Sequence, residues 1–164
     1  MLLKGRNAVV YGAGGALGGA VSRAVAREGA AVFLTGRLLA PVDEVATRIL
    51  VAGGTAEAAV VDANAEQAVE EHAQTVVDRA GSLDISINLI AVDHIQGRPL
   101  IDLSPSDFTL GLEARIRTHF VTARAAARHM VRQRSGAILM VTATSCTSSK
   151  ATICATDSSS CVLA

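Results

Sequence analysis

Apolar runs alternate with helix-like segments along most of the chain. Short runs rich in Val, Ile and Ala predict buried strands, and apolar residues spaced three and four apart predict amphipathic helices between them. Strands are expected over residues 7–11, 31–35, 57–61, 83–91 and 137–142. Helices are expected over residues 16–28, 41–51, 65–80 and 104–133, with a break near residue 117 as an alternative in the last.

Glycine, proline and capping residues mark the ends of these segments. Gly29, Gly53 and Gly81 follow the first three predicted helices and predict their ends. Ser104 is a predicted N-cap, because Pro105 follows at the first helical position and Asp107 three residues after the cap. The repeated strand–helix order predicts an α/β fold with a doubly wound parallel sheet of about five strands.

The composition changes near the end of the chain. All fourteen glycines precede residue 137, whereas fourteen of the residues 142–164 are Ser, Thr or Cys. We therefore expect one domain over residues 1–143 and a poorly ordered tail over residues 144–164. A tail that departs from the ancestral reading frame is an alternative. In either case the sheet is expected to be incomplete at its C-terminal edge, and such an exposed edge makes a homo-oligomer one option.

Charge and cysteine content argue against nucleic-acid binding, membrane binding and metal binding. Fifteen basic and fifteen acidic residues give a formal net charge of zero and are interspersed, so a nucleic-acid or anionic-membrane partner is not expected. No apolar run is long enough to span a membrane, and a cytoplasmic location is the default expectation. The cysteine spacings match no common zinc pattern, so no metal site is predicted; the cysteines are Cys146, Cys154 and Cys161.

The most specific chemical feature is a glycine-rich turn between the first strand and the first helix. Glycines at such a turn let the backbone approach a pyrophosphate, and the helix N-terminus supplies N–H groups and partial positive charge. Gly12, Gly14 and Gly18 are placed for this role, although Leu17 occupies the third position of the strict GxGxxG pattern. The alternative is a tight turn that only allows close helix packing.

The spacing of Gly12, Ala16, Leu17 and Gly18 resembles the TGxxxGxG turn of the short-chain dehydrogenase/reductase family. Tyr11 stands in place of the threonine, and Ala16 in place of the middle glycine. This resemblance implies a Rossmann-like fold and an NAD(P)-dependent oxidoreductase.

Further segments in the same order extend the resemblance. LDISINLIA at 83–91 is similar to the family's fourth strand with its NNAG motif, FVTARAAARHM at 120–130 to its long fifth helix, and GAILMV at 136–141 to its fifth strand. Together they cover about residues 5–143. The resemblance implies a truncated and divergent member that lacks the C-terminal catalytic segment.

Cofactor choice is predicted from the residues after the second strand. An acidic residue there would favour NAD by accepting the ribose 2′-OH, but none lies between residues 29 and 42. Arg37 occupies this region and can pair with the 2′-phosphate of NADP, although a solvated surface arginine is the alternative. Asp62 with Ala63 resembles the family's adenine contact, and Asn88 is expected near the ribose; a helix-capping Asp and a loop Asn are the alternatives.

The family's catalytic residues are not found at the matching positions. The family uses an Asn, a Ser, a Tyr and a Lys, with the Lys lowering the pKa of the Tyr, and these positions hold Arg115, Ala143, Thr156 and Ser160. We therefore expect impaired catalysis, with catalytic residues and substrate unknown. A non-catalytic dinucleotide-binding or interaction module, or a fragment without independent function, are the alternatives.

Overall fold

A computed structural model describes residues 1–92 and 99–141. The chain divides into two compact units. The first comprises Met1–Ala91 with Thr118–Met140, and the described residues of the second are 92, 99–117 and 141. The predicted tail over residues 144–164 lies outside the described residues.

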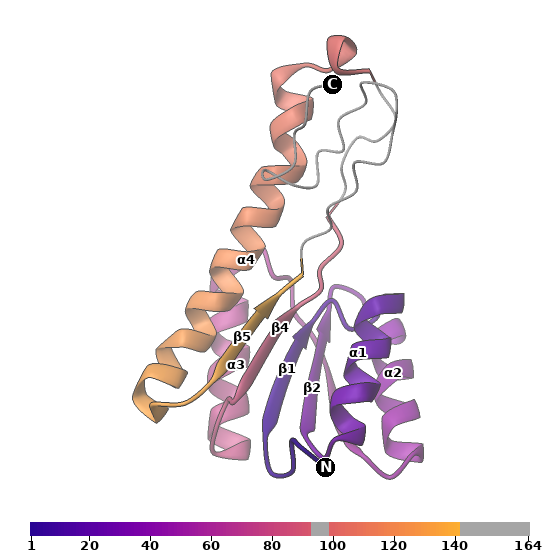
Figure 1. The fold of residues 1–164 in the computed structure, drawn as a ribbon, viewed down its shortest axis with the longest axis vertical. Helices are drawn as coiled ribbons and strands as arrows, with labels where there is room; N and C mark the ends of the chain where they lie inside the picture. Colours follow the sequence, from indigo (N-terminus) through magenta and orange to yellow (C-terminus); the bar gives the residue numbers. More distant parts are fainter. Residues whose placement is uncertain (93–98, 142–164) are drawn as a thin grey trace. The chain divides into compact units, whose positions relative to one another are not determined.

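The first unit contains a parallel five-stranded sheet with the order β3-β2-β1-β4-β5 (Figure 1). The central strand is β1, and all five of its residues are buried. This confirms the predicted doubly wound parallel sheet. The strands are β1 (Asn7–Tyr11), β2 (Ala31–Gly36), β3 (Thr55–Val60), β4 (Ile85–Asn88) and β5 (Ala137–Met140).

Helices cover both faces of this sheet. Along β1, Ala8 and Val10 belong to a core cluster with residues of α1 and α2, whereas Val9 and Tyr11 belong to a second cluster with residues of α3 and α4. The alternation follows from the period of two along a strand. The helices are α1 (Ala16–Arg27), α2 (Leu39–Val51), α3 (Glu66–Ala80) and α4 (Pro105–Gln133), with a 3₁₀ turn η1 at Leu100–Asp102.

Several predicted boundaries differ from the structure by one or two residues, and two predictions differ by more. The strand predicted over residues 83–91 is shorter, because only Ile85–Asn88 lies in the ladder with β1 and β5. The alternative break near Arg117 is wrong, since α4 continues through this residue. No glycine or proline lies between Leu112 and Gln133, so nothing in the local sequence removes a backbone hydrogen bond there.

The described part of the second unit contains η1 and the beginning of α4. The Asp107 N–H donates to Ser104 Oγ at 3.1 Å, and the Ser104 N–H donates to Asp107 Oδ2 at 3.5 Å. This reciprocal pair satisfies N–H groups that have no intrahelical acceptor. It confirms the helix start predicted from Ser104 and Asp107.

A buried carboxylate joins the amino-terminal ends of β1 and β4. Asp84 accepts hydrogen bonds from Arg6 Nη1 at 2.9 Å, the Asn7 N–H at 2.9 Å and Ser82 Oγ at 2.7 Å. Burial alone would raise the pKa of Asp84, but these hydrogen bonds and the charge of Arg6 lower the pKa below its ordinary value of 3.8. The ionised form of Asp84 therefore stabilises the fold.

Candidate dinucleotide-binding site

The carboxyl ends of the parallel strands meet at one edge of the sheet. Tyr11, the last residue of β1, pairs with Thr35 of β2 and Asn88 of β4. Thr35 in turn pairs with Ala59 of β3, and Asn88 pairs with Met140 of β5. The chain order reverses between β1 and β4, and open α/β sheets bind ligands at such a switch point. The predicted cofactor residues follow these strand ends, except Asn88, which is itself the last residue of β4.

The glycine turn after β1 leaves no room for a side chain at Gly12 or Gly18. Gly12 has φ +80, and a Cβ on it would lie 2.7 Å from the Leu89 carbonyl oxygen. A Cβ on Gly18 would lie 2.1 Å from the Gly12 carbonyl oxygen. The turn is fixed to β2, because the N–H groups of Gly12 and Ala13 both donate to the Thr35 carbonyl oxygen at 3.0 Å. Glycine is required at positions 12 and 18 by this close approach of backbone to backbone.

The N-terminus of α1 opens directly from the turn and has no side-chain cap. Its N-cap is Gly15, and its first turn carries no acidic residue. The Gly19 N–H bonds to the Gly15 carbonyl oxygen at 2.8 Å, so the N–H groups of Ala16, Leu17 and Gly18 precede the first intrahelical bond. Among the described residues they have no acceptor. This arrangement fits an anionic group such as a pyrophosphate.

The first turn of α2 packs against the glycine turn and against the end of β2. A Cβ on Gly14 would be 3.0 Å from Pro41 Cβ, and a Cβ on Gly36 would be 2.7 Å from Val42 Cγ2. Arg37 directly follows Gly36, is exposed, and makes no ion pair with the residues that the structure describes. Its guanidinium is therefore available to an anionic ligand.

Asp62 and Ala63 follow β3 at the same edge. The exposed Asp62 carboxylate accepts hydrogen bonds from the Asn64 N–H at 3.0 Å and Asn64 Nδ2 at 3.2 Å. The N-cap of α3 is Ala65, so Asp62 orders the preceding turn and is not the cap of that helix. Ala63 is buried in the core, and only Asp62 presents a polar side chain to solvent.

Asn88 is a buried tether at the end of β4. Its Nδ2 donates to Thr122 Oγ1 of α4 at 3.0 Å, and its Oδ1 accepts from the Ile90 N–H at 3.1 Å. The side chain thus fixes the start of the loop after β4 and joins it to α4. The sequence analysis missed Thr122; the spacing of Thr118 and Thr122, two hydroxyls four residues apart on the buried face of α4, is the signal that could have found it.

Tyr11 cannot act as an acid–base group in this turn. It is 1% exposed, and burial raises the pKa of its phenol well above the ordinary value of 10.0. Its hydroxyl has no hydrogen-bond partner among the described residues. The only tyrosine of the chain is therefore a core residue in its protonated form.

We expect Tyr11→Phe to leave the fold unchanged and to raise the free energy of unfolding by about 1 kcal/mol, because it removes an unsatisfied buried hydroxyl. Urea denaturation followed by circular dichroism measures this difference. A loss of stability of similar size would show that the hydroxyl has a partner.

The positions that match the family's catalytic residues give no catalytic group in the described part of the chain. Arg115 lies in α4, within the second unit. Ala143, Thr156 and Ser160 lie outside the described residues.

In the described residues, the histidines and carboxylates outside the strand ends do not form a catalytic or metal-binding cluster. Burial lowers the pKa of both His72 and His129 below the ordinary 6.5, which favours their neutral forms at pH 7. Across residues 1–92 and 99–141, no group of three or more His, Cys, Asp or Glu side chains could hold a metal. In the same residues, no helix combines the length and apolar character needed to cross a membrane.

Comparison with known proteins identifies relatives of this chain. A family model described as short chain dehydrogenase matches residues 6–159. The mouse peroxisomal multifunctional enzyme type 2 is 31% identical in an alignment of 150 residues that covers 86% of this chain and 20% of that protein. Gluconate 5-dehydrogenase of Gluconobacter oxydans (strain 621H) is 29% identical over 139 residues, covering 85% of this chain and 54% of that enzyme.

Solved structures share the fold. A metagenomic short-chain oxidoreductase in complex with NADP has a TM-score of 0.78 and 28% identity, over 88% of this chain and 65% of that one. A dehydrogenase/reductase from Sinorhizobium meliloti 1021 has a TM-score of 0.73 and 31% identity, over 86% of this chain and 55% of that one. The chain thus spans about half the length, or less, of the Gluconobacter and mouse relatives.

Proposed function

Because this chain belongs to the short-chain dehydrogenase family, we propose that it binds NADP(H) at the carboxyl edge of its sheet, through the glycine turn and Arg37. The observation that carries the proposal is the uncapped N-terminus of α1 behind a turn with no space for a Cβ at Gly12 or Gly18. The backbone N–H groups there would hold the pyrophosphate. NADP(H) would supply or accept the hydride in a redox reaction.

Preference for NADP(H) over NAD(H) rests on Arg37. This arginine is exposed and has no carboxylate partner in the described residues, so a 2′-phosphate would meet an uncompensated guanidinium. The relative in complex with NADP has the same fold. Asp62 is proposed to lie near the adenine, and Asn88 to act by positioning the loop beside the ribose.

We expect Arg37→Gln to weaken NADPH binding about tenfold and to leave NADH binding unchanged, because one charge-assisted hydrogen-bonded contact to the 2′-phosphate is lost. Isothermal titration calorimetry with both nucleotides measures the two dissociation constants. Arg132→Gln, an exposed arginine in the last turn of α4, is the matched control and should change neither. Equal weakening of both nucleotides by Arg37→Gln would contradict the assigned role.

We further propose that hydride transfer is impaired in this chain. The support is the set of side chains at the matching family positions, where Arg115, Ala143, Thr156 and Ser160 replace the Asn, Ser, Tyr and Lys. None of these four offers a phenol activated by a neighbouring ammonium. Oxidation of NADPH in the presence of a panel of carbonyl compounds tests this: binding without turnover supports the proposal, and rapid turnover contradicts it.

A cytoplasmic location and a homo-oligomeric assembly also belong to the proposal. The exposed edge strand β5 supports self-association, because its four residues are all exposed and all apolar. Cell fractionation and analytical ultracentrifugation test the two statements separately.

A further inference from the structure

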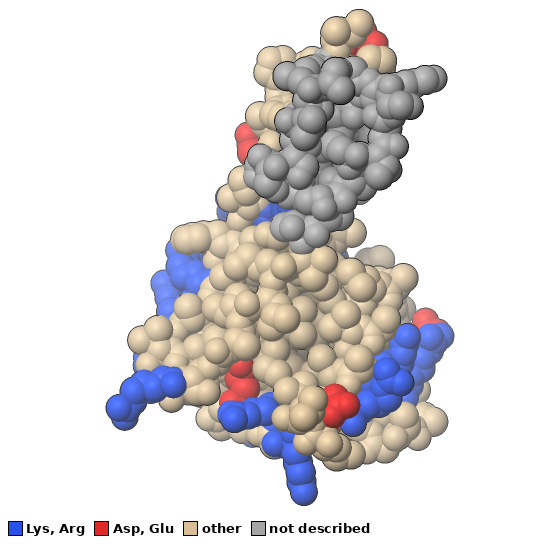
Figure 2. Space-filling view, viewed as in Figure 1, with Lys and Arg blue, Asp and Glu red and all other residues tan. Residues whose placement is uncertain are grey.

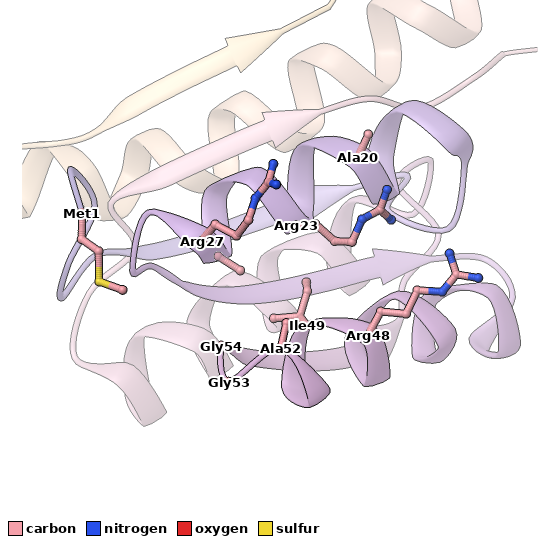
Figure 3. Close-up of a pocket in the computed structure, with 10 residues that line it drawn as sticks. Met1, Ala20, Arg23, Arg27, Arg48, Ile49, Ala52, Gly53 and Gly54 are labelled. Carbon is pink, nitrogen blue, oxygen red and sulfur yellow. The ribbon is translucent and has the colours of Figure 1, made fainter.

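A pocket lies between α1 and α2, on the outer side of the first unit. It has a volume of ≈ 400 Å³, within the range of about 300–1,000 Å³ that is usual for small-molecule sites. It exists because the facing positions of the two helices carry small side chains. Ala20 and Ala26 of α1 face Ala52, Gly53 and Gly54, which follow α2. Figure 3 shows Ile49 between these elements.

Three arginines surround this apolar floor. Arg23 and Arg27 come from α1 and Arg48 from α2, and the side chains of Arg23 and Arg48 extend toward the same end of the pocket (Figure 3). Figure 2 shows Lys and Arg side chains gathered on the side of the molecule where α1 and α2 lie. The pocket therefore combines an apolar base with a basic rim.

The basic rim is only partly neutralised. Arg48 pairs with Glu44 at 2.5 Å, an exposed contact within one helix, and such contacts contribute only about 0.3–0.5 kcal/mol. The N-terminal ammonium of Met1 lies 3.7 Å from Glu28. Arg23 and Arg27 make no ion pair with any residue that the structure describes. An anion bound between Arg23 and Arg48 would thus meet one guanidinium without a competing carboxylate and a second whose exposed pairing with Glu44 is weak.

We propose that this pocket binds a small organic phosphate. The phosphate would accept hydrogen bonds from Arg23 and Arg48, because guanidinium groups match phosphate oxygens in charge and geometry. The apolar or ring portion would lie over Ala20 and Ala52, in contact with Ile49. This site is separate from the proposed cofactor site, since it is formed by the later turns of α1 and not by the glycine turn at its N-terminus.

The experiment titrates the ¹⁵N-labelled full chain with 1-naphthyl phosphate and follows the amide resonances by NMR. The expected shifts concentrate at Ala52, Gly53 and Gly54, with a dissociation constant on the order of 1 mM or tighter. Inorganic phosphate lacks the ring, and 1-naphthol lacks the phosphate, so each should bind at least about tenfold more weakly than 1-naphthyl phosphate. The proposal would be overturned if either compound bound as tightly as 1-naphthyl phosphate, or if the shifts were confined to residues 12–18.

Substitutions locate the site. Arg23→Gln combined with Arg48→Gln should weaken 1-naphthyl phosphate at least about tenfold through lost charge-assisted hydrogen bonds. Ala20→Leu should also weaken it by filling the pocket without changing its charge. Arg37→Gln is the control, and it should leave this binding unchanged whether or not it alters NADPH binding. The proposed site would be refuted if both pocket variants bound 1-naphthyl phosphate as tightly as the parent chain, or if the Arg37→Gln control lost as much affinity as they do.

Discussion

Gly18→Ala is expected to weaken NADPH binding by on the order of a hundredfold or more, because two or more backbone hydrogen bonds to the pyrophosphate would be lost. The added methyl carbon would lie 2.1 Å from the Gly12 carbonyl oxygen, so the turn must open. Overpacking of this kind also costs about 1–3 kcal/mol of stability. Calorimetric titration with NADPH, on protein shown to be folded by circular dichroism, measures the effect.

Gly15→Ala is the matched control for this substitution. It makes the same chemical change in the same turn, but its Cβ would lie 3.6 Å from the Gly12 carbonyl oxygen, an ordinary contact. Position 15 keeps its N–H and has φ −79, which alanine adopts readily. We expect it to bind NADPH nearly as well as the parent chain. If both variants bind equally well, the glycine turn does not hold the pyrophosphate.

Asp84→Asn is expected to lower the free energy of unfolding by about 2–3 kcal/mol at pH 7. The amide would present a donor where the carboxylate accepts from the Asn7 N–H, Ser82 and Arg6. Urea denaturation followed by circular dichroism suits this chain, which has no tryptophan. Asp43→Asn, at an exposed position of α2, is the control and should change stability by less than about 0.5 kcal/mol.

The stability that Asp84 contributes should decrease as the pH falls. The pKa of Asp84 is lower in the folded chain than its ordinary 3.8, so the stabilisation is fully present above that value. It is lost as the pH falls through the folded pKa, because the folded state must then take up a proton that it binds weakly. The two proteins should therefore converge in stability in strong acid. If the difference in free energy of unfolding between the parent chain and Asp84→Asn stayed constant into strong acid, the charge-based explanation would be contradicted.

Local sequence patterns predicted the order of strands and helices well. Apolar periodicity and glycines at helix ends are signals that lie within the segment whose structure they specify. The edge that carries the glycine turn, Arg37 and Asp62 also followed from the sequence, since parallel strands bring their carboxyl ends together. The ends of β4 did not follow, because an apolar run continues beyond the residues that pair in the ladder.

Contacts between distant residues could not be predicted in this way. Asn88 and Thr122 are 34 positions apart, and Arg6 and Asp84 are 78 positions apart. Each pair depends on how a helix or a chain terminus packs against the sheet, which no short pattern encodes. The sequence placed Asn88 at the carboxyl edge of the sheet, but it did not reveal that the Asn88 amide is bonded to Thr122 and to the Ile90 N–H.

The order of the strands also sets which part of the sheet opens first. β1 is buried along its whole length between β2 and β4, whereas every residue of β5 is exposed. Amide protons of β5 are therefore expected to exchange with solvent through local fraying, and those of β1 only when the first unit unfolds as a whole. The strand that leads into the glycine turn is thus the last part of the sheet to lose its protection.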